Sequence, residues 1–236
     1  MSFHFVRKIQ IILVTLELSA AFDFLDKSIL IPKLRAHGFP ERIIAIYNDF
    51  LSDRKAVVQV GESLSEPIDQ EVGCVQGSPS GPLLFSLLVN NISEALNLGK
   101  IVCYADDSYL IFEGDSWDEV CKMASEETTN VMDWLQDIGM VVNSSKTEAM
   151  YFSKHDQDGL KINVASSEIT VGTTMRVLGV MFDSRLSWEN HILHVSSIVK
   201  KKIHALRKIS SDLSQAELLN IAHGSIFSVL CYAAGT

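Results

Sequence analysis

Two adjacent carboxylates are the most unusual of the residues that could carry chemistry: Asp106 and Asp107, in the run Tyr104-Ala105-Asp106-Asp107. Neighbouring acids repel each other, so they need solvent or a cation around them. As solvated residues at a hairpin tip they would simply favour turn geometry. Alternatively they bind a divalent metal ion, because Mg²⁺ prefers carboxylate oxygens and substrate phosphates. The metal interpretation requires a third acid from elsewhere in the chain.

Glu17 is the acid that could complete such a site. It lies at the end of a short apolar run with β-branched residues, 9–18, which predicts a buried strand. Two further strands are predicted at 100–104 and 109–112, with 105–108 as the turn between them. A sheet that contains all three strands would bring Glu17 beside the acidic turn. We therefore expect Glu17, Asp106 and Asp107 to lie together.

The other elements that position these residues follow from periodicity and from residues that start or end helices. Helices are predicted over 27–37, 40–50, 83–96 and 118–138, and again from Trp188 onward. The helix over 118–138 has an apolar face and an acidic face, and the one over 40–50 is predicted to bury Ile43, Ile44, Ile46, Tyr47 and Phe50. Further strands are predicted over 56–60 and 67–72 as a hairpin, and over 146–152, 161–164 and 176–182.

This order of strands and helices lacks strict alternation, so the α+β class is favoured over a doubly wound parallel sheet. The helical texture from Trp188 predicts two domains, 1–185 and 186–236. The composition, 47% apolar and 21% charged over 236 residues, is that of a globular protein.

No membrane helix is expected, because the longest apolar stretch near the start of the chain is well short of the roughly 20 residues a span needs. The beginning of the sequence also lacks a signal-peptide cleavage site. We expect the chain to remain inside the cell, in the nucleus or the cytoplasm, without a membrane partner. The four cysteines form no CxxC pair, which gives little support to a zinc site or a disulfide framework.

The net charge of −9 argues weakly against a nucleic-acid partner, but the charges are unevenly distributed. Residues 195–208 contain no acid and five bases: Lys200, Lys201, Lys202, Arg207 and Lys208. A helix with an apolar stripe and this cationic face could contact a phosphate backbone. Its simpler interpretation is a solvated helix face.

Five blocks, in this order and at this spacing, resemble the reverse transcriptase domain of non-LTR retrotransposons. They cover Leu16 to Asp23, Gly73 to Phe85, Tyr104 to Asp107, Gly139 to Phe152 and Leu178 to His191. The resemblance runs from about residue 13 to the end of the chain. It implies a polymerase palm, built as a ferredoxin-like antiparallel sheet with packed helices, followed by a partial helical thumb.

The resemblance also implies the chemistry. Glu17, Asp106 and Asp107 would hold two Mg²⁺ ions, or Mn²⁺, which activate the primer 3′ hydroxyl and neutralise charge on phosphate oxygens. The implied partners are an RNA template, a DNA primer and deoxynucleoside triphosphates, together with the remainder of a retroelement polyprotein.

The resemblance implies roles for four further residues and for the basic stretch 200–208. Phe22 would disfavour a 2′ hydroxyl on the incoming nucleotide, and Gln76 and Gly77 would lie against that nucleotide and the template base. Lys146 would approach the triphosphate, and the basic stretch 200–208 would grip the primer and template backbone. Without the resemblance these are a core aromatic, an ordinary turn, a surface lysine and a solvated helix.

The sequence departs from the family in ways that bear on activity. The first metal-binding acid is normally aspartate, and the extra methylene of Glu17 displaces the carboxylate by more than the roughly 0.5 Å that a catalytic site tolerates. We also expect the fingers region to be largely missing, because few unmatched residues precede the first block, and we expect the chain to stop within the thumb region.

Three functions are therefore compared. In the first, the domain is an RNA-directed DNA polymerase, and the chain is expected to be a truncated copy of a retroelement polymerase. The second is a catalytically inactive remnant that at most binds nucleic acid or a protein partner, and the departures favour it for the isolated chain. The third, an unrelated scaffold protein with an incidental acidic hairpin, would require the five blocks to be chance.

Overall fold

The computed structural model describes residues 9–234, which form two compact units. Residues 9–149 and 158–171 make the first unit, and residues 150–157 and 172–234 make the second. The predicted boundary near residue 185 differs from this division and falls inside the second unit. The reason is that residues 174–183 form a hairpin that packs against the following helix.

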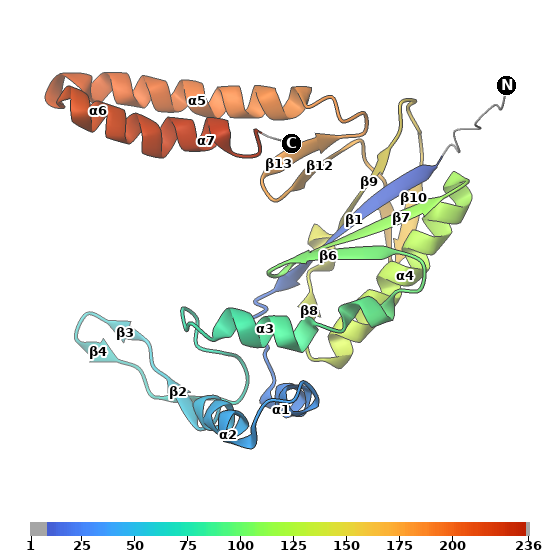
Figure 1. Cartoon of the computed structure of the whole chain (residues 1–236), viewed down its shortest axis with the longest axis vertical. Coiled ribbons are helices and arrows are strands. Elements are labelled where there is room, and N and C mark those ends of the chain that lie inside the picture. Colours follow the sequence, from blue (N-terminus) through green and yellow to red (C-terminus); the bar gives the residue numbers. More distant parts are fainter. Residues whose placement is uncertain (1–8, 235–236) are drawn as a thin grey trace. The chain divides into compact units, whose positions relative to one another are not determined.

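An antiparallel sheet around β1 (Gln10–Ser19) is the centre of the first unit (Figure 1). β7 (Asp107–Gly114) pairs with β1 over its whole length, and β6 (Lys100–Tyr104) pairs with the other edge of β7. β8 (Val141–Val142) and β9 (Glu148–Phe152) also pair with β1. The mixed helix and strand content confirms the α+β prediction, and the strands predicted over 9–18 and 100–104 are present.

Side chains along β1 alternate between two environments because successive residues of a strand point to opposite faces. One face is buried and consists of Ile12, Val14, Leu16 and Leu18. Of the intervening residues, Leu13 is also buried, whereas Thr15, Glu17 and Ser19 are half-buried. The long helix α4 (Trp117–Asp137) packs against both β1 and β7. The acid predicted as a metal ligand is therefore on the face opposite to Ile12, Val14, Leu16 and Leu18, at the end of the strand beyond Leu13.

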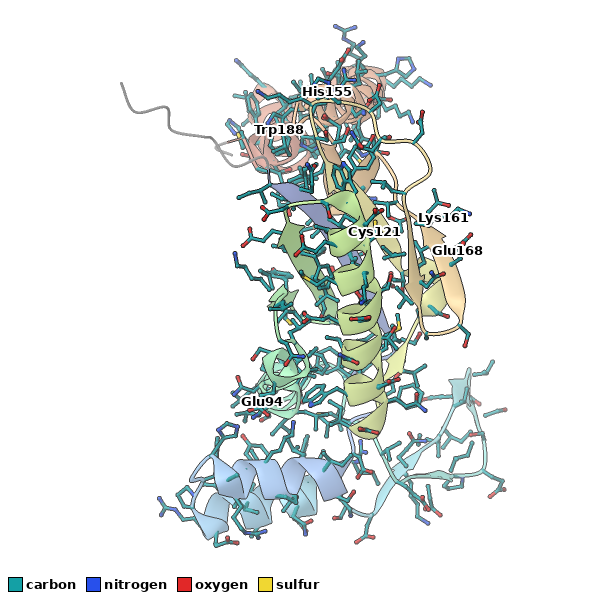
Figure 2. The ribbon with its side chains drawn as sticks, turned by 90° about the vertical axis from the view of Figure 1, so that its right-hand side faces the viewer. Glu94, Cys121, His155, Lys161, Glu168 and Trp188 are labelled. Carbon is teal, nitrogen blue, oxygen red and sulfur yellow. The ribbon has the colours of Figure 1, made fainter. Side chains whose placement is uncertain are left out.

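The apolar stripe predicted for α4 is confirmed, since Val120, Ala124, Val131 and Leu135 are fully buried. β10 (Lys161–Val164) and β11 (Ser167–Thr170) form a hairpin. Side-chain hydroxyls of α4 accept hydrogen bonds from the backbone of this hairpin. Asn163 N donates to Ser125 Oγ at 2.9 Å and Ala165 N donates to Thr129 Oγ1 at 3.0 Å. Figure 2 shows Cys121 on α4 beside Lys161 and Glu168 of this hairpin.

One acid of α4 does not lie on the solvated face as predicted. Glu127 is only 5% exposed, and its carboxylate accepts hydrogen bonds from three consecutive backbone N–H groups. Its Oε1 accepts from Asn97 N at 3.2 Å and Leu98 N at 2.8 Å, and its Oε2 accepts from Gly99 N at 2.7 Å. These bonds satisfy the backbone that leads into β6, which the sequence pattern of α4 could not indicate.

Two helices and a hairpin follow β1. In α1 (Lys27–Ala36), Asp26 caps the first turn by accepting from Ser28 N at 2.7 Å, and Gly38 after the helix has a φ of 77°. α2 (Glu41–Phe50) starts after Pro40 as predicted, but Ile46 is 61% exposed, so its predicted burial is wrong. Among the apolar residues predicted to be buried in α2, Ile44 is the one that reaches the core.

The hairpin predicted over residues 56–72 forms in two separate ladders. β2 (Arg54–Ala56) pairs with β5 (Ile68–Gln70), and β3 (Gln59–Val60) pairs with β4 (Ser63–Leu64). The segment then leads to α3 (Gly81–Val89), which is shorter than the helix predicted over 83–96 because a separate 3-10 turn covers Ile92–Ala95.

The second unit combines a hairpin with helices. The strand predicted over 176–182 is instead a hairpin of β12 (Thr174–Val177) and β13 (Val180–Asp183), because Leu178 and Gly179 both take positive φ values, 47° and 84°. It is followed by α5 (Glu189–Ile209), α6 (Gln215–Ala222), a π-helical turn (His223–Phe227) and α7 (Ser228–Cys231). Across residues 9–234, every helix is too short or too polar to cross a bilayer.

Asp183 organises the turn between β13 and α5. Its carboxylate accepts from Ser187 N and Oγ, from Trp188 N at 3.0 Å and from Arg185 N at 3.1 Å. Desolvation alone would raise the pKa of the Asp183 carboxyl, but these hydrogen bonds together lower the pKa below its ordinary value. This network and the edge-on contact of Phe182 with Trp188 hold Ser187 and Trp188 in place at the start of α5.

We predict that Glu127→Gln lowers the free energy of unfolding by about 2 kcal/mol. The amide removes the charge and turns a donor toward backbone N–H groups that need an acceptor. Urea unfolding followed by circular dichroism measures the change. The matched control is Glu126→Gln, an exposed neighbour paired with Lys122 at 3.8 Å, which should change stability by less than about 0.5 kcal/mol. Equal effects of the two substitutions would contradict this role.

We also predict a pH-dependent contribution from Asp183. Because its folded-state pKa is lowered, the charged carboxylate stabilises the fold above its ordinary pKa of 3.8, and this stabilisation is lost as pH falls through the lowered value. Asp183→Asn should cost about 2 kcal/mol near neutral pH, and the difference from the unmodified chain should shrink in acid. Urea titrations across this range measure it, with Asp212→Asn as the exposed control. A difference that is constant with pH would contradict the assignment.

Candidate functional site

The pairing of β1 with β7 brings two of the predicted acids together. Glu17 and Asp107 are direct partners in the antiparallel register. Partners opposite each other in such a pair have their Cβ atoms about 5 Å apart on one face of the sheet. Both residues are half-buried. The two carboxylates therefore share the face of the sheet opposite to Ile12, Val14 and Leu16.

Asp106 occupies a different kind of position. Tyr104 pairs directly with Asp107, which leaves Ala105 and Asp106 as a two-residue turn. Ala105 has a φ of 53°, in the left-handed region. The predicted turn over 105–108 was too long, since β7 starts at Asp107. This difference matters because strand geometry, rather than loop geometry, orients Asp107 toward Glu17.

Lys146 forms an ion pair with Glu17. Its Nζ donates to Glu17 Oε1, and both side chains are about half exposed to solvent. The segment that carries Lys146 is attached to β1, because Asn143 N donates to Glu17 O at 2.9 Å and Val142 pairs with Leu18. The structure thus joins two residues for which separate roles, metal binding and triphosphate binding, were predicted.

Asp107 also has a partner on its own strand. Tyr109 Oη donates to Asp107 Oδ2 at 3.3 Å. Tyr109 is 7% exposed and pairs with Thr15, so four side chains with oxygen atoms line this face: Thr15, Glu17, Asp107 and Tyr109. The sequence analysis did not single out Tyr109, although its two-residue spacing from Asp107 in a strand puts both on one face.

Phe22, Gln76 and Gly77 line a single cavity of about 380 Å³, together with Val75, Ser78, Gly81 and Pro82. Phe22 packs against Phe85 of α3, with ring centroids 5.4 Å apart. Gly77 has a φ of 80° and open space where a Cβ would lie. Glycine is therefore favoured at this position by the backbone conformation and not by the close approach of another group. Three of the four residues predicted to bind the nucleotide are therefore neighbours around one space, and Lys146 is not among the residues that line it.

The close backbone approach occurs at Gly73, which the sequence analysis did not distinguish from the other glycines. A Cβ there would lie 2.8 Å from the backbone oxygen of Asp23, and the φ of Gly73 is 92°. Gly73 N donates to Leu25 O at 2.8 Å, and Cys74 N donates to Phe22 O at 2.7 Å. Arg54 adds two bonds, from its Nη2 to the backbone oxygens that precede Cys74.

The basic helix α5 belongs to the second unit. Lys200, Lys201, Arg207 and Lys208 are exposed, and with His204 they span about 120° of the helix circumference at 100° per residue. Lys202 differs, since it is half-buried and donates to Ser225 O at 2.8 Å. The apolar residues Val195, Val199, Ile203 and Leu206 are half-buried, whereas Ile192, predicted in the same stripe, is 60% exposed.

The predicted acids have the ligand chemistry that a divalent metal ion needs, but their side chains are not arranged to hold one. Glu17 and Asp107 supply hard oxygen donors on one face, which is the ligand type that Mg²⁺ prefers. Among residues 9–234, however, no three His, Cys, Asp or Glu side chains are grouped closely enough to hold a metal ion. The ammonium of Lys146 also stands at the Glu17 carboxylate. A site with two metal ions would require these side chains to rearrange.

Comparison with known proteins identifies the family. Residues 4–182 match the family model described as reverse transcriptase (RNA-dependent DNA polymerase). The chain is 32% identical over 145 residues to a Retrovirus-related Pol polyprotein from type-1 retrotransposable element R1 of Nasonia vitripennis, a match that covers 58% of this chain and 43% of that protein. It is 24% identical over 203 residues to a probable RNA-directed DNA polymerase from transposon BS of Drosophila melanogaster, covering 82% and 22%.

Solved structures of telomerase from Candida tropicalis have a similar fold. Its apo form, truncated from the C-terminal domain, aligns with a TM-score of 0.53 at 15% identity over 76% of this chain and 35% of that chain. Its complex with a fragment of telomeric RNA aligns with a TM-score of 0.54 at 11% identity over 94% and 37%. At these identities the likeness concerns the fold alone.

The chain belongs to the reverse transcriptase family. Its relatives make it a domain of the non-LTR retrotransposon type, as the five sequence blocks predicted. It spans less than half the length of the curated relatives described above.

Proposed function

We propose that the first unit catalyses RNA-directed DNA synthesis, with the end of β1 and the start of β7 as its reaction centre. The observation that carries the proposal is the direct pairing of Glu17 with Asp107. This pairing places two acids far apart in sequence on one sheet face, as a reaction centre that binds metal ions requires. In this interpretation the first unit belongs to a palm and α5 begins a thumb.

Reverse transcriptases generally use divalent metal ions. We propose that this chain uses Mg²⁺, or Mn²⁺ in its place, with Glu17, Asp106 and Asp107 as the ligands. The support is the donor chemistry of these residues, and the requirement is that Lys146 leaves Glu17. Lys146 would then be free to approach the triphosphate, the role that the sequence predicted for it.

The cavity lined by Phe22, Gln76 and Gly77 is proposed as the site of the incoming deoxynucleotide. Phe22 forms an apolar wall, where it would exclude a 2′ hydroxyl, and Gln76 and Gly77 supply the polar rim. The partners proposed with it are an RNA template and a DNA primer. The exposed basic face of α5 supports phosphate contacts, and relatives named Pol polyprotein support a larger polyprotein context.

A second candidate function is a catalytically inactive domain that binds nucleic acid or a protein partner. The ion pair between Glu17 and Lys146 favours it, because a lysine ammonium at this carboxylate opposes a cation there. Glu17 itself also departs from the aspartate of the family. The two candidates differ in whether this pair can be opened.

We predict that Lys146→Met tightens Mn²⁺ binding about threefold to tenfold, because a unit charge near a divalent ion is repulsive even in water. Titration followed by electron paramagnetic resonance measures it. The matched control is Lys161→Met, since Lys161 forms a similarly exposed pair with Glu168 at 2.7 Å on the same unit. Unchanged affinity in Lys146→Met, or an equal gain in the control, would contradict competition at Glu17.

We also predict that Glu17→Asp raises primer extension on an RNA template, by up to about 100-fold, because it withdraws the carboxylate from Lys146 and shortens the side chain to the length the family uses. Incorporation of labelled deoxynucleotides in Mg²⁺ measures it. Adding Asp106→Asn or Asp107→Asn to Glu17→Asp should abolish the gain. Extension that survives these changes would place the chemistry elsewhere, and no extension in any variant would favour the inactive alternative.

A further inference from the structure

We propose that Asp23 is a positioning residue that fixes the amide of Gln76, so that the cavity presents an acceptor and selects a ligand with a hydrogen-bond donor at that point. The inference rests on the proposed function for the identity of the ligand, a deoxynucleotide. The orientation of the amide itself does not depend on that function.

The hydrogen bond between the two side chains sets the direction of the amide. Gln76 Nε2 donates to Asp23 Oδ1 at 2.9 Å. A carboxylate oxygen accepts and does not donate, so the amide must turn its NH₂ group toward Asp23. The amide oxygen is then the atom left for the cavity that Gln76 lines. Without Asp23 the two ends of the amide could exchange, and the site would offer a donor as readily as an acceptor.

The backbone on both sides of this pair is held in place. Asp23 N donates to Ala20 O at 2.8 Å in a tight turn, and Ala20 has a φ of 48°. Phe22 and Leu25, on either side of Asp23, accept from the segment two and three residues before Gln76. The carbonyl of Asp23 lies against Gly73 so closely that a side chain there would collide with it. The pair is therefore prearranged by the same contacts that build the cavity wall.

Two simpler roles for Asp23, capping a helix and binding a metal ion, are not supported by the structure. Helix α1 needs an N-cap, but Asp26 supplies it through its bond to Ser28 N. A metal-binding role would require other ligands nearby, and the described residues contain no such group. Asp23 and Gln76 are both exposed, so their bond contributes little to stability. Orientation of the amide is the consequence that remains.

The same short turn thus supplies two features of one cavity. Phe22 forms its apolar wall, and the next residue along the chain fixes the polarity of its rim. A deoxynucleotide can offer a donor from its 3′ hydroxyl or from N–H groups of its base. Both sources share the chemistry that a fixed amide oxygen accepts, and they can be separated by removing the hydroxyl while the base is kept.

The first measurement tests the orientation alone. The side-chain NH₂ resonances of Gln76 are assigned by their loss in Gln76→Ala, and we expect them to shift and to exchange faster with solvent in Asp23→Ala. Asp23→Asn should largely restore them, because an asparagine oxygen can still accept from Gln76. The matched control is Asp49→Asn, an exposed aspartate on α2, which should leave them unchanged. Resonances that do not respond to Asp23→Ala would overturn the inference.

The second measurement tests selection by binding, without turnover. Calorimetric titration compares each deoxynucleoside triphosphate with its 2′,3′-dideoxy analogue for the unmodified chain, Asp23→Ala and Asp23→Asn. We expect Asp23→Ala to reduce the preference for the deoxynucleoside triphosphate over its dideoxy analogue by about fivefold to tenfold, and Asp23→Asn to retain most of this preference. If Asp23→Ala instead reduces a preference for one base over the others, the donor is on the base.

The outcomes separate this inference from the proposed function. A preference that is unaltered in Asp23→Ala would overturn the selective role of Asp23. A chain that binds no nucleotide, yet whose Gln76 amide responds to Asp23→Ala, would overturn the proposed function while the positioning of Gln76 by Asp23 stands.

Discussion

The register between β1 and β7 is the constraint on which the candidate site depends. A shift of one residue would exchange the two faces of β1 and turn Glu17 into the core. Burial prevents that shift, because Ile12, Val14 and Leu16 would have to leave the apolar layer beneath α4. The two-residue turn at Ala105 and Asp106 separately fixes the register of β6 against β7. The hydrophobic core therefore positions the carboxylates without contacting them.

Both carboxylates at this face have a hydrogen-bond partner within the chain itself. The carboxylate of Glu17 is paired with Lys146, and that of Asp107 accepts from Tyr109. Exposed ion pairs contribute little free energy, so the pair at Glu17 can be displaced by a stronger ligand for either group. An exposed pair of this kind differs from a buried ion pair, whose opening would leave an uncompensated charge in the protein interior.

The cavity wall is constructed differently, from backbone contacts. The turn after β1 and the segment before α3 are joined by hydrogen bonds from Gly73 and Cys74. Glycine is required at the first of these because its φ is positive and a side chain would strike Asp23. These contacts explain how residues on a turn, Phe22 and Asp23, can act with Gln76, more than fifty positions away in the sequence.

The sequence alone was sufficient for the family, for the α+β class and for most helices and strands near the site, because periodicity, caps and ordered motifs are local signals. It also indicated Asp106, Asp107 and Glu17 from their residue types and the predicted strands. Phe22, Gln76 and Gly77 were indicated through the resemblance. The burial of Ile46 and the exposure of Glu127 were mispredicted, because an amphipathic pattern does not reveal which neighbouring segment covers a helix.

The tertiary structure decided which of these residues meet. The pairing of Glu17 with Asp107, the ion pair of Lys146 with Glu17 and the bond of Asp23 to Gln76 all join segments separated by dozens of residues. No local pattern encodes such partners. Strand register, set by the burial of one sheet face, and the close backbone approach at Gly73 determine them, and both are properties of packing between segments rather than of any one segment.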